Sequence, residues 1–328
     1  MGTQSNIVDN LLEPLERYLQ MAGIYYRAFA RRKSSLSIKK KLEVKQNNYI
    51  EQGKKMQDFV GIRLVFYFLD DVNIFHQKLQ TLEGYDVKNE ANTSTDLEII
   101  AKLGHHIAED DTLKPLQAIL PIHDKVFMPQ RLNIVMKMPD SVARLMEMEL
   151  PTDLTSEQVN LIDSTYEVQL RTVLSEGWHE VEHDLRYKSL SEDWWDSCRE
   201  ESRQLNGIYA SLEANEMALL RMIDGIAYKN YKGGSWDAMI RNHFRLRFNE
   251  IKLSENFQSL LDGNKEIAKQ LLRIERAELI NWIWSIPRRM PLTTNHIMCL
   301  ANRKKLKCEE IYTNEPSAIK TDFDAIGI

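Results

Sequence analysis

The chain has 328 residues, enough for about two domains, and 43% of them are hydrophobic, which is enough for a sizeable core. No segment approaches the ~20 consecutive apolar residues of a membrane span, and residues 1–10 are polar and lack an apolar signal core. Cys198, Cys299 and Cys308 are scattered, which favours reduced thiols over a disulfide framework or a zinc site. These features predict a cytoplasmic protein with no membrane partner.

The net charge of −5 hides a basic segment, because Lys and Arg outnumber Asp and Glu between residues 229 and 308. One interpretation is a surface that attracts nucleic acid, such as tRNA. The other, which we favour, is that these charges solvate helices through pairs such as Glu266 and Lys269.

The hydrophobic pattern predicts the elements in chain order. Residues 6–42 are expected to be helical, because Leu11, Leu15 and Leu19 recur at helical spacing. Residues 59–68 are rich in Val, Ile, Phe and Tyr and predict a strand. Beyond it we expect a helix over 72–83, a strand near 85–87, a helix around 95–108, a strand over 131–138, a helix and a loop over 140–163, a strand over 164–171 and helices from about 173 to 230.

These elements predict an α+β fold, in which helices pack on a small mixed sheet. Gly233-Gly234 is the strongest boundary signal in the chain. We therefore expect one domain over residues 1–232 and a helical C-terminal domain over 235–328. The expected core of the second domain is Leu271, Leu272, Ile274, Leu279, Ile280, Ile283 and Trp284.

The predicted strand Glu167-Val168-Gln169-Leu170-Arg171-Thr172 is polar where a buried strand is ordinarily apolar. Alternate side chains of a strand share a face, so Glu167, Gln169 and Arg171 point one way while Val168 and Leu170 pack. One face therefore offers a carboxylate, an amide and a guanidinium to a polar ligand. Trp178, which follows the strand, is expected in the core.

Two other polar segments precede this strand, the run from Arg31 to Lys41 and the segment from Asp58 to Arg63. The cations of the first suit a triphosphate, and the alternative is a solvated basic helix. The Asp58 carboxylate suits magnesium, which prefers hard oxygen ligands, and the alternative is a turn or cap residue. For Arg63, one interpretation is a structural ion pair with Glu167.

Together, the three segments resemble the synthetase domain of the RelA/SpoT family of alarmone synthetases. These enzymes move a pyrophosphate from ATP onto a nucleotide 3′-hydroxyl. The family patterns R-x-K-x-x-x-S-I-x-x-K, D-x-x-G-x-R and E-x-Q-x-R-T, with a downstream E-H and Y-K, occur in order between residues 31 and 188. The resemblance implies a nucleotidyltransferase-like core, ATP as donor substrate and Mg²⁺ as cofactor.

The resemblance also implies a role for each matching residue. Asp58, Arg63 and Glu167 would be catalytic, with Asp58 and Glu167 as metal ligands, Glu167 alternatively as general base, and Arg63 on a phosphate. The nucleotide-binding residues would be Arg31, Lys33, Ser37, Lys41, Gln169, Arg171, His183 and Lys188. For His183, a structural role on a helix is the alternative.

The chain departs from the family where the acceptor should bind. Family members carry a G-Y-x-S-x-H segment whose Tyr stacks on the acceptor guanine. Residues 126–135 here read VFMPQRLNIV, with neither Tyr nor His. The donor half of the site is therefore supported, while the acceptor stays open between a guanine nucleotide, an adenine nucleotide and a tRNA 3′ end.

The expected function is a pyrophosphokinase of the alarmone-synthetase type in a stress response or phage defence. The hydrolase region of the long enzymes is not found, so an antitoxin or the C-terminal domain is expected to restrain the enzyme. A phage protein and a second copy of the chain are further expected partners. One alternative is a nucleotidyltransferase that makes a nucleotide signal. Another is a catalytically inactive nucleotide sensor, against which the paired carboxylates Asp58 and Glu167 argue.

Overall fold

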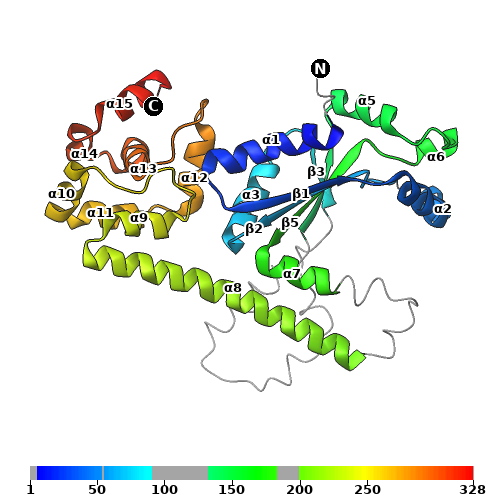
Figure 1. The fold of residues 1–328 in the computed structure, drawn as a ribbon, viewed down its shortest axis with the longest axis horizontal. Helices are drawn as coiled ribbons and strands as arrows, with labels where there is room; N and C mark the ends of the chain where they lie inside the picture. The colour runs from blue at the N-terminus through cyan, green and yellow to red at the C-terminus, as the bar shows by residue number, and fades with distance from the viewer. Residues whose placement is uncertain (1–5, 54, 91–131, 183–198, 328) are drawn as a thin grey trace. The chain divides into compact units, whose positions relative to one another are not determined.

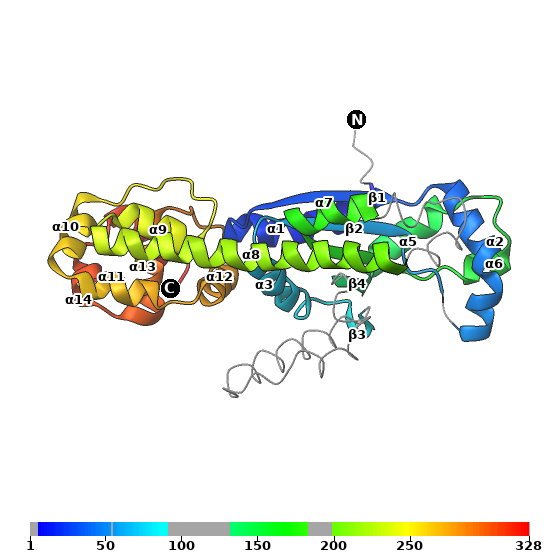
Figure 2. The same cartoon turned by 90° about the horizontal axis from the view of Figure 1, so that it is seen from below.

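The computed structural model describes residues 6–53, 55–90, 132–182 and 199–327, and it divides into two compact units (Figure 1). The sheet unit comprises Met1–Leu12 and Arg27–Glu216, and the helical unit comprises Glu13–Tyr26 and Met217–Ile328. Helix α8 (Arg199–Gly233) is one continuous helix that contributes its first half to the sheet unit and its second half to the helical unit (Figure 2). The domain limits of 1–232 and 235–328 therefore stay a prediction.

The sheet unit is built on a mixed sheet of five strands in the order β1-β2-β5-β4-β3. Strands β2 and β5 run parallel, and β4 is antiparallel to both of its neighbours. This arrangement confirms the predicted α+β fold with a mixed sheet. The strands are β1 (Tyr26–Arg32), β2 (Val60–Phe66), β3 (Tyr85–Glu90), β4 (Leu132–Lys137) and β5 (Thr165–Thr172).

Helices cover the sheet on both faces, and the two faces differ in polarity. On one face, Phe75 of α3 packs against Phe66 of β2, with ring centroids 5.7 Å apart. On the opposite face, α7 places Glu176 against Arg63 of β2. The buried side chains Ile62, Leu64 and Phe66 of β2 therefore face α3, and the polar side chains of β2 and β5 face α7. The helices are α1 (Ile7–Ala22), α2 (Ser35–Gln52), α3 (Leu69–Leu79), α5 (Asp140–Glu149), α6 (Ser156–Asn160) and α7 (Val173–Glu182).

The predicted helix over residues 6–42 is wrong in its middle, where β1 forms. Helix α1 ends at Ala22, before Gly23, which has a positive φ of 65°. The following residues, YRAFARR, alternate between exposed and half-buried positions, as an edge strand with one covered face does. Ser34 then caps α2 by accepting a hydrogen bond from the Ser37 amide.

The strands predicted at 59–68, 85–87, 131–138 and 164–171 are confirmed, and the helix predicted around 95–108 lies outside the described residues.

The helical unit confirms the predicted C-terminal helices. The Trp284 indole donates a hydrogen bond of 2.8 Å to the Tyr18 carbonyl, which joins the end of α1 to this unit. Of the predicted core, Leu272 and Trp284 are half-buried and the other five side chains are buried. Its further elements are α9 (Trp236–Phe244), α10 (Glu255–Gly263), α11 (Lys265–Leu272), α12 (Arg276–Ser285), α13 (Thr294–Ala301), η5 (Asn302–Leu306), α14 (Glu309–Thr313) and α15 (Ser317–Ala325). Among the helices the structure describes, none has the length and apolar character that crossing a membrane requires.

Candidate active site

The pairing of β2 with β5 brings two of the three sequence motifs together. Gly61 lies opposite Glu167, and Arg63 lies opposite Gln169. Because residues opposite each other in a sheet project to the same face, all four occupy the face that α7 covers in part. The apolar neighbours Ile62, Leu64, Val168 and Leu170 point to the other face and are at most 2% exposed. The alternation expected for the motif strand is therefore confirmed.

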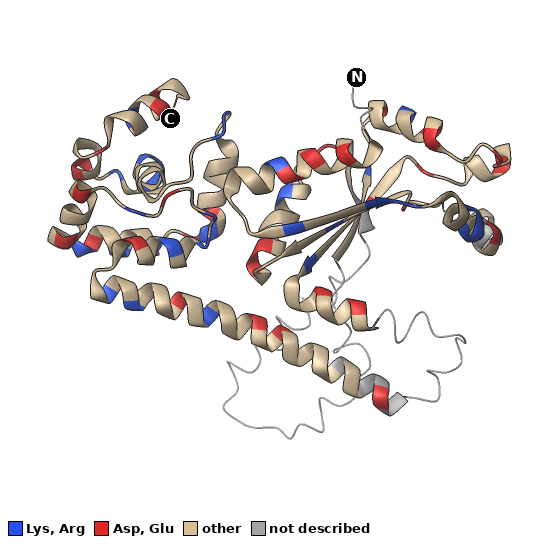
Figure 3. Ribbon diagram, viewed as in Figure 1, with Lys and Arg blue, Asp and Glu red and all other residues tan. Residues whose placement is uncertain are grey.

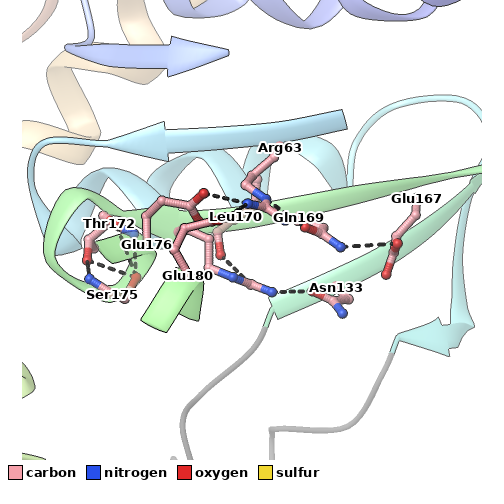
Figure 4. A network of polar contacts seen from close by, with 10 residues as sticks. Arg63, Asn133, Glu167, Gln169, Leu170, Thr172, Ser175, Glu176 and Glu180 are labelled. Carbon is pink, nitrogen blue, oxygen red and sulfur yellow. Dashed lines mark hydrogen bonds and ion pairs between the residues drawn. The ribbon is translucent and has the colours of Figure 1, made fainter. Parts of the chain in front are cut away.

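Arg63 is held by three side chains (Figure 4). Its Nε donates to Gln169 Oε1 at 2.9 Å, and its Nη1 donates to Glu176 at 2.5 Å and to Glu180 at 2.8 Å. A structural ion pair between Arg63 and Glu167 was one prediction from the sequence. The structure instead pairs Arg63 with Glu176 and Glu180 of α7. Glu176 and Glu180 are one helical turn apart, so a single helix face presents both carboxylates to the guanidinium.

Glu167 has few partners compared with Arg63 and Arg171. Within the described residues, its carboxylate accepts one hydrogen bond, from Gln169 Nε2 to Oε2 at 3.2 Å. Gly61 beside it is open, because a Cβ added there would meet no atom within 4 Å. A half-buried carboxylate with a free oxygen thus borders an open position on the sheet, which is the geometry that a metal ligand or a general base needs.

Arg171 is placed differently from the other motif residues. It is 6% exposed, and its guanidinium donates to Asn133 Oδ1 of β4 at 2.8 Å and to the Leu170 carbonyl at 2.9 Å. This placement favours a role in joining β4 to β5. Its predicted role in nucleotide binding stays a prediction.

Asp58, just before the start of β2, forms ion pairs with two lysines of the first motif, Lys33 and Lys41. Lys33 Nζ donates to Oδ2, and Lys41 Nζ donates to both carboxylate oxygens, each at 2.7 Å. Burial raises the pKa of Asp58, but the hydrogen bonds and charges of Lys33 and Lys41 together outweigh it, so the pKa lies below its ordinary value. The three side chains therefore form one ionised cluster, with 26% of the Asp58 side chain exposed.

The remaining residues of the first motif stand at the entrance to α2. The Ser37 hydroxyl lies 2.8 Å from the Ser34 hydroxyl, which caps the helix. Arg31 is exposed at the end of β1, and within the described residues its side chain makes no hydrogen bond or ion pair. Figure 3 marks basic residues in blue on the ribbon at the end of β1 and on α2. Of these cations, Lys33 and Lys41 contact Asp58, and Gly61 is three positions further along the chain, a span of at most about 11 Å.

Two predicted nucleotide-binding residues, His183 and Lys188, lie outside the described residues. Trp178 is 8% exposed, which confirms its expected place in the core. Sequence reasoning missed Glu176, Glu180 and Asn133. The spacing of the two glutamates on one helix face was the available signal for the first two, and no local pattern marked Asn133.

The carboxylates differ in their fit to magnesium. In the described part of the chain, no group of three or more His, Cys, Asp or Glu side chains is arranged so that it could hold a metal ion. Glu167 fits as a ligand because one of its oxygens is free and it borders the open position at Gly61. Asp58 does not fit in this arrangement, since both of its oxygens accept hydrogen bonds from lysines.

Comparison of the chain with solved structures finds small alarmone synthetases. The small alarmone synthetase 1 from Bacillus subtilis bound to its product pppGpp is 18% identical, with a TM-score of 0.40, over 65% of this chain and 90% of that one. A GTP pyrophosphokinase family protein from Streptococcus pneumoniae is 20% identical, with a TM-score of 0.38, over 65% and 84%.

No protein-family model matches the chain, and no curated protein is similar to it. At these identities and TM-scores the structural likeness carries no conclusion about chemistry. The case for an activity rests on the side chains of the sheet unit.

Proposed function

We propose that the sheet unit is an ATP-dependent pyrophosphokinase, which transfers pyrophosphate from ATP to the 3′-hydroxyl of a nucleotide or an RNA end. The observation that carries the proposal is the free carboxylate oxygen of Glu167 beside the open position at Gly61, with the cluster of Asp58, Lys33 and Lys41 just before the start of β2. A base beside a cluster of cations suits the transfer of a charged phosphoryl group to a hydroxyl.

Lys33, Lys41 and Arg31 would bind the triphosphate of ATP. Both lysines contact Asp58 at 2.7 Å, so their ammonium groups lie together, as the binding of a triphosphate requires. Arg31 is exposed and unengaged among the described residues, and it could grip a phosphate or stack on the adenine. Ser37, at the start of α2, would add a hydroxyl donor.

Glu167 would act on the acceptor. Its carboxylate takes the proton of the 3′-hydroxyl, the 3′-oxygen bonds to the β-phosphorus of ATP, and the bond from that phosphorus to the bridging oxygen of AMP breaks. Within the described residues, Arg63 Nη2 makes no hydrogen bond, so it is free to stabilise charge on the transferred group. Magnesium would supply neutralisation of the phosphate charge; Glu167, as the alternative to its role as base, has the free oxygen that could hold the metal, whereas both Asp58 oxygens are engaged by lysines.

Residues 126–131 contain no Tyr to stack on an acceptor base, and this bears on which acceptor is preferred. Stacking of a base on an aromatic side chain contributes roughly 1–3 kcal/mol, and no Tyr is found in this segment, which lies outside the described residues. We therefore propose that GDP and GTP are poor acceptors and that another nucleotide or a tRNA end is preferred. Efficient transfer to GDP or GTP at micromolar concentration would refute this.

The test is to incubate purified protein and Mg²⁺ with ATP labelled in the β-phosphate, separately with each acceptor. Transfer predicts label on the acceptor and release of AMP. Release of pyrophosphate instead would establish the alternative, a nucleotidyltransferase. No turnover with any acceptor, together with ATP binding, would favour the nucleotide sensor. The test variant is Glu167→Gln, which should show no transfer. Glu147→Gln is its matched control, because it is the same substitution at an exposed position on α5.

We further propose that the reaction takes place in the cytoplasm during stress or phage infection, and that an antitoxin or the helical unit restrains it. The support is the chemistry itself, since unrestrained transfer would drain ATP. Relief of growth arrest on co-expression of a candidate partner with the full chain tests this restraint.

A further inference from the structure

A buried glutamate on α8 contacts the point where β5 becomes α7. Glu216 is 7% exposed, and its Oε1 accepts a hydrogen bond from the Thr172 hydroxyl. Thr172 is the last residue of β5, and both residues belong to the sheet unit. A carboxylate is seldom this buried unless a partner compensates for the loss of water. The burial of the Glu216 carboxylate against Thr172 therefore needs a structural or functional reason.

Thr172 and Ser175 fix the start of α7 by bonding to each other. The Thr172 amide donates to Ser175 Oγ at 2.8 Å, and the Ser175 amide donates to Thr172 Oγ1 at 3.1 Å (Figure 4). This reciprocal pair is a capping box with serine at its third position. The Thr172 hydroxyl accepts from the Ser175 amide, and its one proton faces two acceptors, Ser175 Oγ at 3.0 Å and the closer Glu216 Oε1.

Helix α7 in turn carries the carboxylates that hold Arg63. Glu176 follows the capping box by one residue, and Glu180 lies one turn further on; both accept from Arg63 Nη1. Gln169 continues the chain of contacts from Arg63 Nε to Glu167. A shift at the start of α7 would thus change where the Arg63 guanidinium points.

The surroundings of Glu216 keep this contact isolated from solvent. Burial raises the pKa of Glu216, while the hydrogen bond from Thr172 lowers it in part. Glu213, one turn earlier on α8, also has a pKa raised by burial, and the Tyr209 hydroxyl bonds to it. Arg171 of β5 is the cation that acts on Tyr209. Glu216 is therefore one member of a buried polar layer between α8 and β5.

We propose that Glu216 is a positioning residue for pyrophosphate transfer. It anchors the capping box of α7 and thereby sets the orientation of Arg63 through Glu176 and Glu180. The proposal rests on the proposed function, because Arg63 matters only if a phosphoryl group is transferred beside it. Glu216 itself touches no substrate.

The test compares Glu216→Leu with Glu216→Gln. Leucine removes the acceptor and leaves the Thr172 hydroxyl without it, whereas glutamine keeps an oxygen at the same place. We expect Glu216→Leu to lower kcat at least tenfold with the KM for ATP within threefold, and Glu216→Gln to retain kcat within threefold. Equal losses in both variants, or an unchanged kcat in Glu216→Leu, would overturn the proposal.

A double-mutant cycle with Arg63→Gln separates positioning from general destabilisation. If Glu216 acts through Arg63, adding Glu216→Leu to Arg63→Gln should lower kcat by less than threefold further. Additive losses would refute the pathway. If Glu216→Leu does not fold, Thr172→Val and Thr172→Ser serve in its place, with the serine variant expected to retain kcat.

Amide hydrogen exchange gives a readout that does not depend on activity. Glu216→Leu should speed exchange in the first turn of α7, at residues 175–178, and Glu216→Gln should not. Unchanged exchange in Glu216→Leu would overturn the anchoring even if the wild-type protein proved inactive. Wild-type inactivity with faster exchange in the leucine variant would instead refute the proposed function and leave the anchoring intact.

Discussion

Replacing Glu167 by glutamine should abolish transfer while leaving the fold intact. The change removes the negative charge and the basic oxygen but keeps the shape of the side chain. Loss of a general base typically slows a reaction at least about 10²-fold, which corresponds to about 2.7 kcal/mol of transition-state stabilisation. The KM for ATP should change little, because the donor is assigned to Arg31, Lys33 and Lys41.

The cost to stability should be much smaller. Glu167 makes one hydrogen bond of 3.2 Å to Gln169 among the described residues, and glutamine keeps an oxygen that can accept it. The loss should therefore be below about 1 kcal/mol, since a typical hydrogen bond contributes about that much. In a domain of this size such a change shifts the melting temperature by less than about 4 °C.

The assay measures AMP release and the melting temperature of the same preparation of Glu167→Gln, with Glu147→Gln as the control. A variant with near wild-type turnover would refute the role of Glu167. A variant that lost activity together with more than about 10 °C of melting temperature would show that the side chain supports the fold, contrary to the reasoning from its single hydrogen bond.

Three more outcomes are expected. Lys41→Ala and Arg31→Ala should raise the KM for ATP more than the KM for the acceptor; unchanged kinetic constants in both would favour a solvated basic helix. The lowered pKa of Asp58 means that its contribution to stability is complete above its unfolded pKa of about 3.9 and is lost as the pH falls through the lower folded value. Asp58→Asn should therefore lose less stability than the wild type on acidification below about pH 4, as followed by urea unfolding, and parallel losses would contradict the ion cluster. A chain that ends at Gly234 should aggregate, because it keeps Tyr18 and Gly23 but lacks their partners Trp284 and Arg247; a monodisperse truncated protein on size exclusion would show that the helical unit is dispensable.

The sequence alone determined the strands that carry the site. Alternation of polar and apolar residues marked β5, and the apolar run after Asp58 marked β2, because side-chain direction in a strand follows from a period of two. The same alternation is present in β1, but the helical spacing of α1 just before it is the stronger local signal. There, tertiary pairing with β2 decided the conformation of a short segment whose local preference was weak.

Only the tertiary structure decided which side chains meet. The pairing of β2 with β5 set Arg63 beside Gln169, and the packing of α7 gave Arg63 two carboxylate partners in place of Glu167. Glu216 is 44 residues from Thr172 in the chain, and no local pattern connects them. A sequence pattern encodes the direction of a side chain within its own element, whereas its partners depend on how separate elements pack, which is a property of the whole unit.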